Sequence, residues 1–189
     1  MYKSAWSFLV YLYGLVVQII WNCEEPLKIS AGSLNRIEYF GTWYFIAAAG
    51  KEESHLHTFK HVDNIIFDLQ GAESPERLVL RGALQVSGHG CIDKKWIYFI
   101  HRHQDGLDLQ GRPERKTFLY QSDTKNSIIL QEIEETGDHP FNRIMLYARS
   151  RNLTSDHVQD FQEKASCMGL KVFLLMPQEE EYCIIKELD

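Results

Sequence analysis

Two short runs of the sequence combine positive charge, aromatic rings and hydroxyl groups at alternate positions. These runs are Lys94, Trp96, Tyr98 and Arg143, Met145, Tyr147. Alternate side chains of a β-strand lie on one face, so each run, if extended, brings its three side chains together. Ammonium, guanidinium, indole and phenol groups all donate hydrogen bonds, which suits the polar head of an otherwise apolar ligand. The alternative for each single cation, including Arg112, is a solvated charge at the rim of the fold.

The elements that would carry these faces are short strands separated by turn residues. Eight runs rich in β-branched and aromatic residues occur at similar spacing, which predicts an all-β sandwich or barrel. They are residues 41–48, 61–69, 77–86, 91–101, 107–110, 116–121, 127–133 and 143–150. If the eight strands close into a barrel, one of the two polar faces described above lines its interior.

One amphipathic helix interrupts the series. Apolar residues at helical spacing predict a helix over residues 155–168, with Ser155 as its N-cap and Gly169 as its left-handed C-terminal cap. A short closing strand over residues 171–176 follows. We therefore expect one domain over residues 23–189, because a chain of this size buries a substantial single core. The net charge of −6 argues against a nucleic-acid partner.

The first 22 residues have the layout of a secretory signal peptide. Lys3 precedes an apolar run from Ala5 to Trp21, but bulky residues stand where cleavage needs small ones. We expect residues 1–22 to remain uncleaved and to hold the protein to lipid. The alternatives are a signal peptide cut at an unusual site and a signal-anchor that stays in the membrane.

The four cysteines are consistent with an oxidising compartment. An even number in a secreted chain predicts two disulfides, for which the sequence alone leaves three pairings open. Asn152 begins an Asn-Leu-Thr glycosylation sequon, which predicts a secreted surface loop.

Motifs for metal binding and catalysis are weak or missing from the sequence. The pairs His55/His57 and His101/His103 have strand spacing but no third ligand nearby, so we expect no metal site. The sequence contains no G-x-S-x-G, H-E-x-x-H or phosphate-binding glycine motif, and we expect neither an enzyme nor a cofactor.

Two local motifs and the order of elements resemble the lipocalin family. Gly41-Thr42-Trp43 is similar to the family's G-x-W motif, and the segment around Arg149 is similar to its arginine motif. Arg149 is then expected to lie over the Trp43 indole in a cation–π contact that closes the barrel floor. The alternative is a core tryptophan and an unrelated surface arginine. The resemblance implies an eight-stranded antiparallel up-and-down barrel with one C-terminal helix.

Longer segments are similar to the apolipoprotein M family over essentially the whole chain. They are residues 43–47, 62–67, 95–98, 111–113 and 135–137, together with the leader. The resemblance implies a secreted, monomeric lipid carrier that is anchored in high-density lipoprotein by its leader. The implied ligands are sphingosine-1-phosphate, fatty acids and retinoids, and an endocytic receptor is an implied partner.

The resemblance also assigns individual residues. It places Lys94, Trp96 and Arg112 at the phosphate, and Tyr98, Glu135, Arg143 and Tyr147 at the amino-alcohol part of the ligand. Lys94 departs from the family pattern, in which an arginine is expected, and so gives up the bidentate geometry of a guanidinium. The implied disulfides are Cys23–Cys167 and Cys91–Cys183, while His157 stands where a third bridge would have a cysteine.

Three other functions stay open at the level of sequence. A membrane-tethered lipocalin would share every motif after Cys23, and a purely structural barrel would hold no ligand. A lipocalin-type isomerase would need a free cysteine in the cavity.

Overall fold

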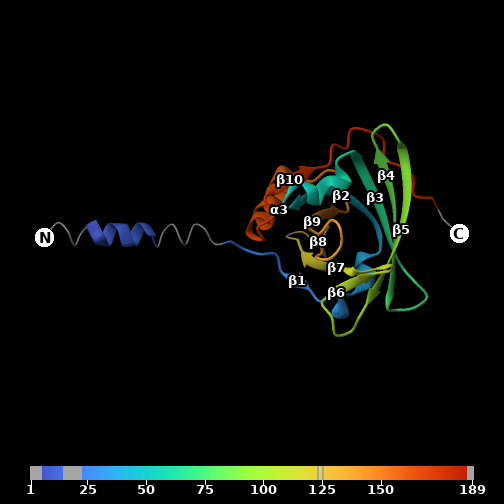
Figure 1. Cartoon of the computed structure of the whole chain (residues 1–189), viewed down its shortest axis with the longest axis horizontal. Coiled ribbons are helices and arrows are strands. Elements are labelled where there is room, and N and C mark those ends of the chain that lie inside the picture. Colours follow the sequence, from blue (N-terminus) through green and yellow to red (C-terminus); the bar gives the residue numbers. More distant parts are fainter. Residues whose placement is uncertain (1–5, 15–22, 123, 125, 187–189) are drawn as a thin grey trace.

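The computed structural model describes residues 6–14, 23–122, 124 and 126–186, and its main feature is an antiparallel sheet that closes on itself (Figure 1). The strands of the barrel are β2 (Gly41–Gly50), β3 (Val62–Gly71), β4 (Arg77–Val86), β5 (Gly90–Ile100), β6 (Gly106–Leu109), β7 (Arg112–Gln121), β8 (Ser127–Glu134) and β9 (Phe141–Ala148). Each strand pairs with its sequence neighbour, β2 pairs with β9, and the resulting ring confirms the predicted eight-stranded barrel.

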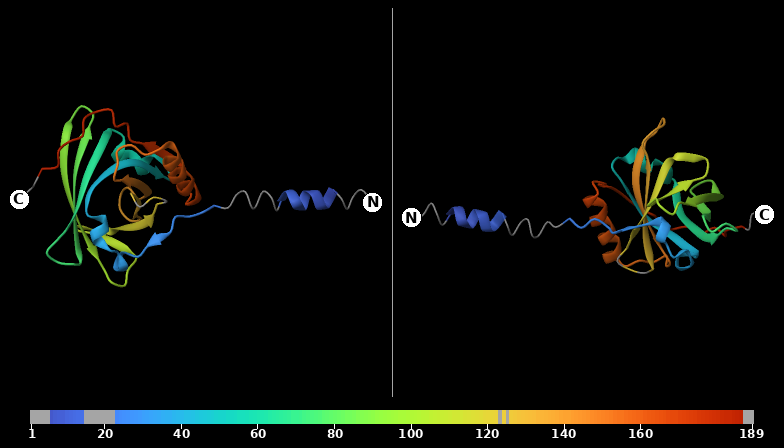
Figure 2. Two further views of the ribbon diagram at one scale, coloured as in Figure 1. Left: turned by 180° about the vertical axis from the view of Figure 1, so that it is seen from behind. Right: turned by 90° about the horizontal axis from the view of Figure 1, so that it is seen from below.

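Smaller elements surround the barrel. Strand β1 (Lys28–Ile29) extends the sheet beside β7, and β10 (Val172–Leu175) pairs with β2. Helix α3 (Ser155–Cys167) covers part of the outer wall (Figure 2). Three short helices lie at the ends of the barrel: η1 (Ala31–Ser33), α2 (Arg36–Tyr39) and η2 (Glu53–Phe59).

Most strands lie where the sequence predicts them, with two informative differences. Strand β7 begins at Arg112 rather than at Lys116, because a tight turn with Gly111 at φ +79° pairs Leu109 directly with Arg112. Pro113 and the neighbouring charges hide this start in the sequence. Helix η2 was not predicted, since its apolar Leu56 and Phe59 stand among polar residues in a segment too short to show a period.

The alternation of side chains gives the barrel two separate apolar cores. Inward residues such as Trp43, Phe45 and Phe67 form the core inside the barrel. Outward residues of β2, β8 and β9 form a second core with Phe161 and Ala165 of helix α3. Small alanines on the outer wall and on the helix allow this close packing.

The ends of helix α3 confirm one predicted cap and correct the other. Gly169 has φ +76°, and the amide of Leu170 donates to the Ala165 carbonyl, as expected for a left-handed C-terminal cap. The N-cap is Thr154 rather than Ser155, because Thr154 is the last residue with extended backbone. Its hydroxyl is 2.9 Å from Nδ1 of His157. His157 is the residue that stands where the family resemblance implies a cysteine of a third disulfide.

Two disulfides fasten the chain ends to the barrel. Cys23 is bonded to Cys167 at the end of α3, and Cys91 on β5 is bonded to Cys183 in the C-terminal segment. All four cysteines are therefore paired. Residues 6–14 are helical and carry large exposed apolar side chains, and none of the helices among the described residues has the length and hydropathy to cross a bilayer.

Candidate functional site

The N-terminal segment lies across one end of the barrel, which we call the closed end. Gly32 packs so tightly on the turn between β5 and β6 that a Cβ there would be 2.6 Å from the carbonyl oxygen of Arg102. The Arg36 guanidinium donates to the Pro75 carbonyl in the turn between β3 and β4. Residues 31–39 therefore seal the end at which these turns meet.

Trp43 and Arg149 hold the closed end together. The guanidinium of Arg149 lies 3.8 Å from the centroid of the Trp43 ring, in a cation–π contact. It also donates to the carbonyls of Thr42 and Glu38, and the indole of Trp43 donates to the Tyr39 carbonyl at 2.8 Å. Gly41 approaches the same guanidinium with φ +92°, a backbone conformation that favours glycine.

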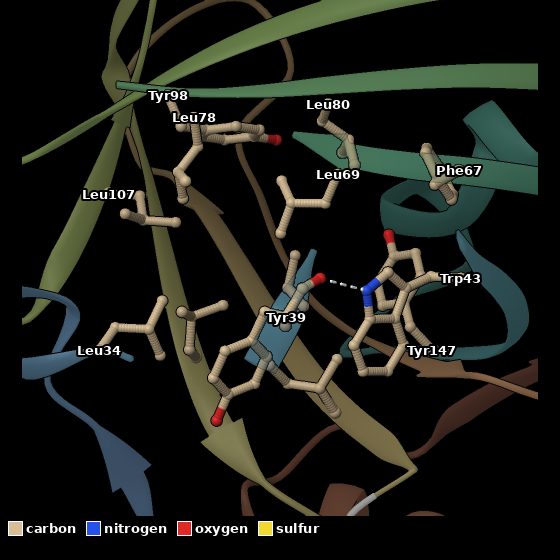
Figure 3. Close-up of a pocket in the computed structure, with 13 residues that line it drawn as sticks. Leu34, Tyr39, Trp43, Phe67, Leu69, Leu78, Leu80, Tyr98, Leu107 and Tyr147 are labelled. Atoms are coloured by element: carbon tan, nitrogen blue, oxygen red, sulfur yellow. Dashed lines mark hydrogen bonds between the residues drawn. The ribbon is translucent and has the colours of Figure 1, made fainter. Parts of the chain in front are cut away.

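An apolar cavity of about 70 Å³ lies inside the barrel above this closure (Figure 3). Side chains from all eight barrel strands point into it, and the segment over residues 31–39 supplies two more. The lining residues are Leu34, Tyr39, Trp43, Phe67, Leu69, Leu78, Leu80, Tyr98, Leu107, Leu119, Ile128, Leu130 and Tyr147. The cavity offers an alkyl chain almost entirely hydrocarbon surface.

Polarity changes along the inward face of the strands. On β8, Ile128 and Leu130 line the cavity, whereas the next two inward residues, Glu132 and Glu134, are acidic. On β7 the inward face runs from Leu119 at the closed end to Arg115 near the opposite end, which we call the mouth. The interior is therefore apolar at the closed end and charged toward the mouth.

Two buried charges inside the barrel form an ion pair across neighbouring strands. Glu132 on β8 is directly opposite Arg143 on β9, and its Oε2 accepts hydrogen bonds from Nη2 and Nε at 2.6 and 3.0 Å. The two side chains are only 9% and 7% exposed. The guanidinium also lies between the rings of Phe59 and Phe141, at 4.6 and 4.5 Å from their centroids.

A second ion pair lies beside the first. Glu134 on β8 is opposite Arg115 on β7 and accepts a hydrogen bond from its Nε at 2.9 Å. Arg112 is more open, with a side chain that is 56% exposed, and its Nη1 is 3.7 Å from carboxylate oxygens of both Glu114 and Glu134. We refer to Arg115, Glu132, Glu134 and Arg143 as the charged layer.

Two phenol groups connect the cavity with the charged layer. Tyr98 and Tyr147 line the cavity, and burial together with the negative charge of Glu132 raises the pKa of both hydroxyls well above their usual value. The hydroxyls therefore stay protonated at neutral pH. They can donate hydrogen bonds to a polar group that reaches the layer.

The other sequence-predicted site residues lie nearer to solvent. Trp96 is half-buried, with its ring centroid 5.7 Å from that of Phe67, in space that Gly82 leaves by having no side chain. Lys94 follows on the same face of β5 and is exposed. Glu135 is exposed in the turn after β8, away from the buried carboxylates, and Asn152 is exposed before helix α3.

Helix η2 packs over the mouth of the barrel. Its Leu56 and Phe59 are buried, and the Phe59 ring lies 4.9 Å from that of Phe45 inside the barrel. The His55 carbonyl accepts a hydrogen bond from Nη1 of Arg143 at 3.4 Å. Arg143 thus connects this helix to the charged layer.

Sequence reasoning missed three members of this site: Arg115, Glu132 and Glu134. Part of the signal was present, because the predicted strand over residues 127–133 carries two apolar side chains and Glu132 on one face, and Glu134 is the next residue on that face. Their partners could not be read from the sequence, since the pairing depends on the register of β8 with both of its neighbours.

The fold and the apolar interior define a lipocalin. The barrel resembles the solved structures of two siderocalins. One is Ex-FABP, described as functioning through dual ligand specificities, with a TM-score of 0.65, 16% identity, and coverage of 80% of this chain and 98% of that one. The other, described as having a dual ligand binding mode, has a TM-score of 0.66, 17% identity, and coverage of 82% and 98%.

Sequence comparison assigns the particular family. The ApoM domain profile matches residues 1–187. Apolipoprotein M of Mus musculus and that of Rattus norvegicus are each 33% identical to this chain over 189 residues, covering 97% of both chains in each comparison. The chain belongs to the apolipoprotein M family, and the family and fold together describe a lipid-binding carrier.

Proposed function

We propose that the protein is a secreted carrier of sphingosine-1-phosphate that holds the lipid inside its barrel and associates with lipoprotein particles. Fatty acids and retinoids are further candidate ligands. The observation that carries the proposal is the change of polarity along the inward strand faces, from hydrocarbon at the closed end to charge at the mouth. A single-chain amphiphile has the same distribution of polarity, so its tail fits the cavity and its head fits the mouth.

Each candidate residue has a role in this arrangement. Lys94, Trp96 and Arg112 supply donors to the phosphate near solvent, while Tyr98, Tyr147 and Arg143 lie deeper, beside the amino alcohol. Glu135 is placed in the rim turn, from which a carboxylate can meet an ammonium group that stays near the mouth.

The size of the cavity implies movement on binding. Ligand pockets commonly enclose about 300–1,000 Å³, well above the 70 Å³ present here. Displacement of helix η2 adds room at the mouth, because Leu56 and Phe59 are buried there and the Phe59 ring lies against the Arg143 guanidinium. Loading of a long-chain lipid therefore requires these side chains to withdraw.

Replacing Arg112 by alanine tests the phosphate site. A hydrogen bond to a charged group contributes about 1.5–3 kcal/mol, so the affinity for sphingosine-1-phosphate should fall about tenfold to a hundredfold. Retinol carries no phosphate, and its affinity should stay within about twofold of the wild type. Fluorescence titration of both lipids measures the two effects.

A matched control is available at the other end of the barrel. Arg102 is an exposed arginine in the turn between β5 and β6, and Arg102→Ala should leave both affinities unchanged. Equal losses for the two lipids in the Arg112 variant would reject the phosphate assignment.

Retention of residues 1–22 is the second part of the proposal. It rests on the bulky residues at the expected cleavage position and on the exposed apolar side chains of the helix over residues 6–14. Part of the leader, residues 1–5 and 15–22, lies outside the described residues. The intact mass of the protein secreted by cultured cells should include these 22 residues, and the protein should float with lipoproteins on density centrifugation. A mass that corresponds to a chain starting near Cys23 would show that the leader is cleaved and that the secreted protein has no such anchor.

The alternatives are less well supported. A lipocalin-type isomerase requires an unpaired cavity cysteine, but all four cysteines form disulfides. A membrane-tethered lipocalin would sediment with membranes instead of floating with lipoproteins, so the same centrifugation separates it from a carrier.

A further inference from the structure

A groove of about 1010 Å³ runs beside helix α3 on the outside of the barrel. Its apolar lining comes from Val158 on the helix, Leu153 before the helix and Leu175 on strand β10. Leu175 is 50% exposed, whereas the other residues of β10 are half-buried. Apolar side chains that lie together at a surface mark a place where another apolar surface can bind. We refer to this feature as the α3 groove.

The leader is attached to the folded domain at the α3 groove. Cys23 and Cys167 both line the groove, and their disulfide holds the two Cα atoms 5.3 Å apart at the end of the helix. Trp21 is two positions before Cys23, and two residues of chain span at most about 7 Å. A leader that enters lipid as far as Trp21 therefore brings the α3 groove to the lipid surface.

The groove belongs to the wall of the barrel and not to either of its ends. Helix α3 packs on outward residues of β2, β8 and β9, and β4 and β5 lie on the opposite side of the barrel (Figure 1). A lipid surface at the groove would therefore contact the wall and leave the mouth accessible.

The charged groups around the groove are carboxylates. Glu163 lines it, and the exposed Glu24 and Glu25 follow Cys23 in the chain. Among the described residues, no lysine, arginine or histidine is part of the lining. Anionic lipid surfaces attract basic segments and therefore repel acidic ones. A phosphocholine head group instead ends in a quaternary ammonium, which a carboxylate can approach.

We propose that the α3 groove is a docking face for a phosphocholine lipid surface, on which the barrel lies on its side. Leu153, Val158 and Leu175 enter the surface beside the leader, and the surrounding carboxylates meet the choline ammonium groups. The inference rests on the proposed association with lipid through the retained leader. It adds a contact that the folded domain itself makes, and this contact sets the orientation of the barrel.

Carboxylate footprinting of the full chain tests the contact. Carbodiimide labelling, followed by mass spectrometry, compares the protein in solution with the protein bound to vesicles of pure phosphatidylcholine. The labelling rate of Glu163 should fall by about fivefold or more on the vesicles, because the lipid surface covers it. Glu76, which is exposed in the turn between β3 and β4, should keep its rate within about twofold.

Substitution of Leu175 measures what the groove contributes to binding. In Leu175→Ser the protein should leave captured phosphatidylcholine vesicles about fivefold faster, because the exposed half of a leucine side chain no longer gains by leaving water. Ile184→Ser is the matched control. Ile184 is 85% exposed in the C-terminal segment beside β3 and β4, and its substitution should leave the rate within about twofold. Thermal unfolding shows whether either variant has lost its fold, and the footprint of the wild type needs no substitution.

Vesicles made of equal parts of phosphatidylcholine and phosphatidylglycerol test the head-group preference. The wild type should leave these vesicles about tenfold faster than vesicles of pure phosphatidylcholine. In Glu163→Gln the ratio of the two rates should shrink by about threefold, whereas Glu76→Gln should leave it unchanged. This comparison separates the charge at the groove from the net charge of the whole chain.

The outcomes distinguish the docking face from the anchor. If Glu163 of vesicle-bound protein were labelled as fast as in solution, the domain would stand off from the lipid and the docking face would be overturned, while the association through the leader would stand. If Leu175→Ser weakened self-association of the lipid-free protein but did not change its release from vesicles, a second copy would be the occupant and the proposal would be wrong. Equal release from both kinds of vesicle would overturn the role of the carboxylates. A wild-type protein that bound neither vesicle would overturn the proposed association with lipid surfaces itself.

Discussion

Replacing Arg143 by methionine is expected to lower the free energy of unfolding by about 3–5 kcal/mol. The substitution leaves the Glu132 carboxylate 9% exposed inside the barrel, without the guanidinium that donates two hydrogen bonds to it. It also removes the cation between the Phe59 and Phe141 rings and the hydrogen bond to the His55 carbonyl. Urea denaturation of the wild type and of Arg143→Met measures the difference in the free energy of unfolding.

A second substitution separates the buried charge from the lost packing. In Arg143→Met combined with Glu132→Leu, no charge is left unpaired, so most of the lost stability should return. Lys116→Met breaks the exposed pair with Asp108 and should cost less than about 1 kcal/mol. If Arg143→Met were as stable as the wild type, the ion pair would have no structural role and the charged layer would be open to rearrangement.

This sensitivity reflects how the barrel combines stability with function. Arg143 contacts η2 at the mouth and Glu132 in the wall. The negative charge of Glu132 in turn raises the pKa of both tyrosine hydroxyls at the cavity. A ligand that displaces η2 therefore loosens one side of the Arg143 environment while leaving its ion pair intact. Opening the mouth costs the packing of Leu56 and Phe59 and the hydrogen bonds that His55 forms with Arg143 and with the Asn142 backbone.

The barrel could be predicted from the sequence because its strands are local patterns. Alternation of apolar residues over 77–86 locates β4 at its observed boundaries, and the helical spacing over 155–168 predicts the helix that packs on the outer wall. Each of these segments signals its structure without reference to the rest of the chain. The same alternation correctly groups Lys94, Trp96 and Tyr98 on one face.

The charged layer could not be predicted in the same way. Glu132 and Arg143 are eleven positions apart in sequence, and only the register of β8 with β9 makes them direct partners. The position of η2 is also a tertiary result, since Phe59 is buried by Phe45 and Arg143 rather than by its own segment. A side chain that the family resemblance assigns to the ligand, such as Arg143, can therefore have an internal partner that the motif does not show.

Removing the Cys91–Cys183 disulfide is expected to have an effect of similar size. The bridge closes a loop with a sequence separation of 92, for which the chain-entropy model gives about 4–5 kcal/mol. Urea denaturation of the Cys91→Ser, Cys183→Ala variant should show a loss close to this value, because alanine avoids placing a hydroxyl at the buried position 183.

The noncovalent contacts of the C-terminal segment decide whether that full loss is reached. Asp63 on β3 accepts hydrogen bonds from the amides of Glu179 and Glu180, and Asn64 donates to the Glu180 carbonyl. If these contacts hold the segment without the bridge, the two amides stay protected from hydrogen exchange. The unfolded chain then gains the full loop entropy while the native state is unchanged, and stability falls by the whole expected amount. If the amides exchange rapidly, the segment detaches locally and the loss of global stability is smaller. A variant as stable as the wild type, with both amides protected, would contradict this prediction. It would show that the bridge does not lower the entropy of the unfolded chain.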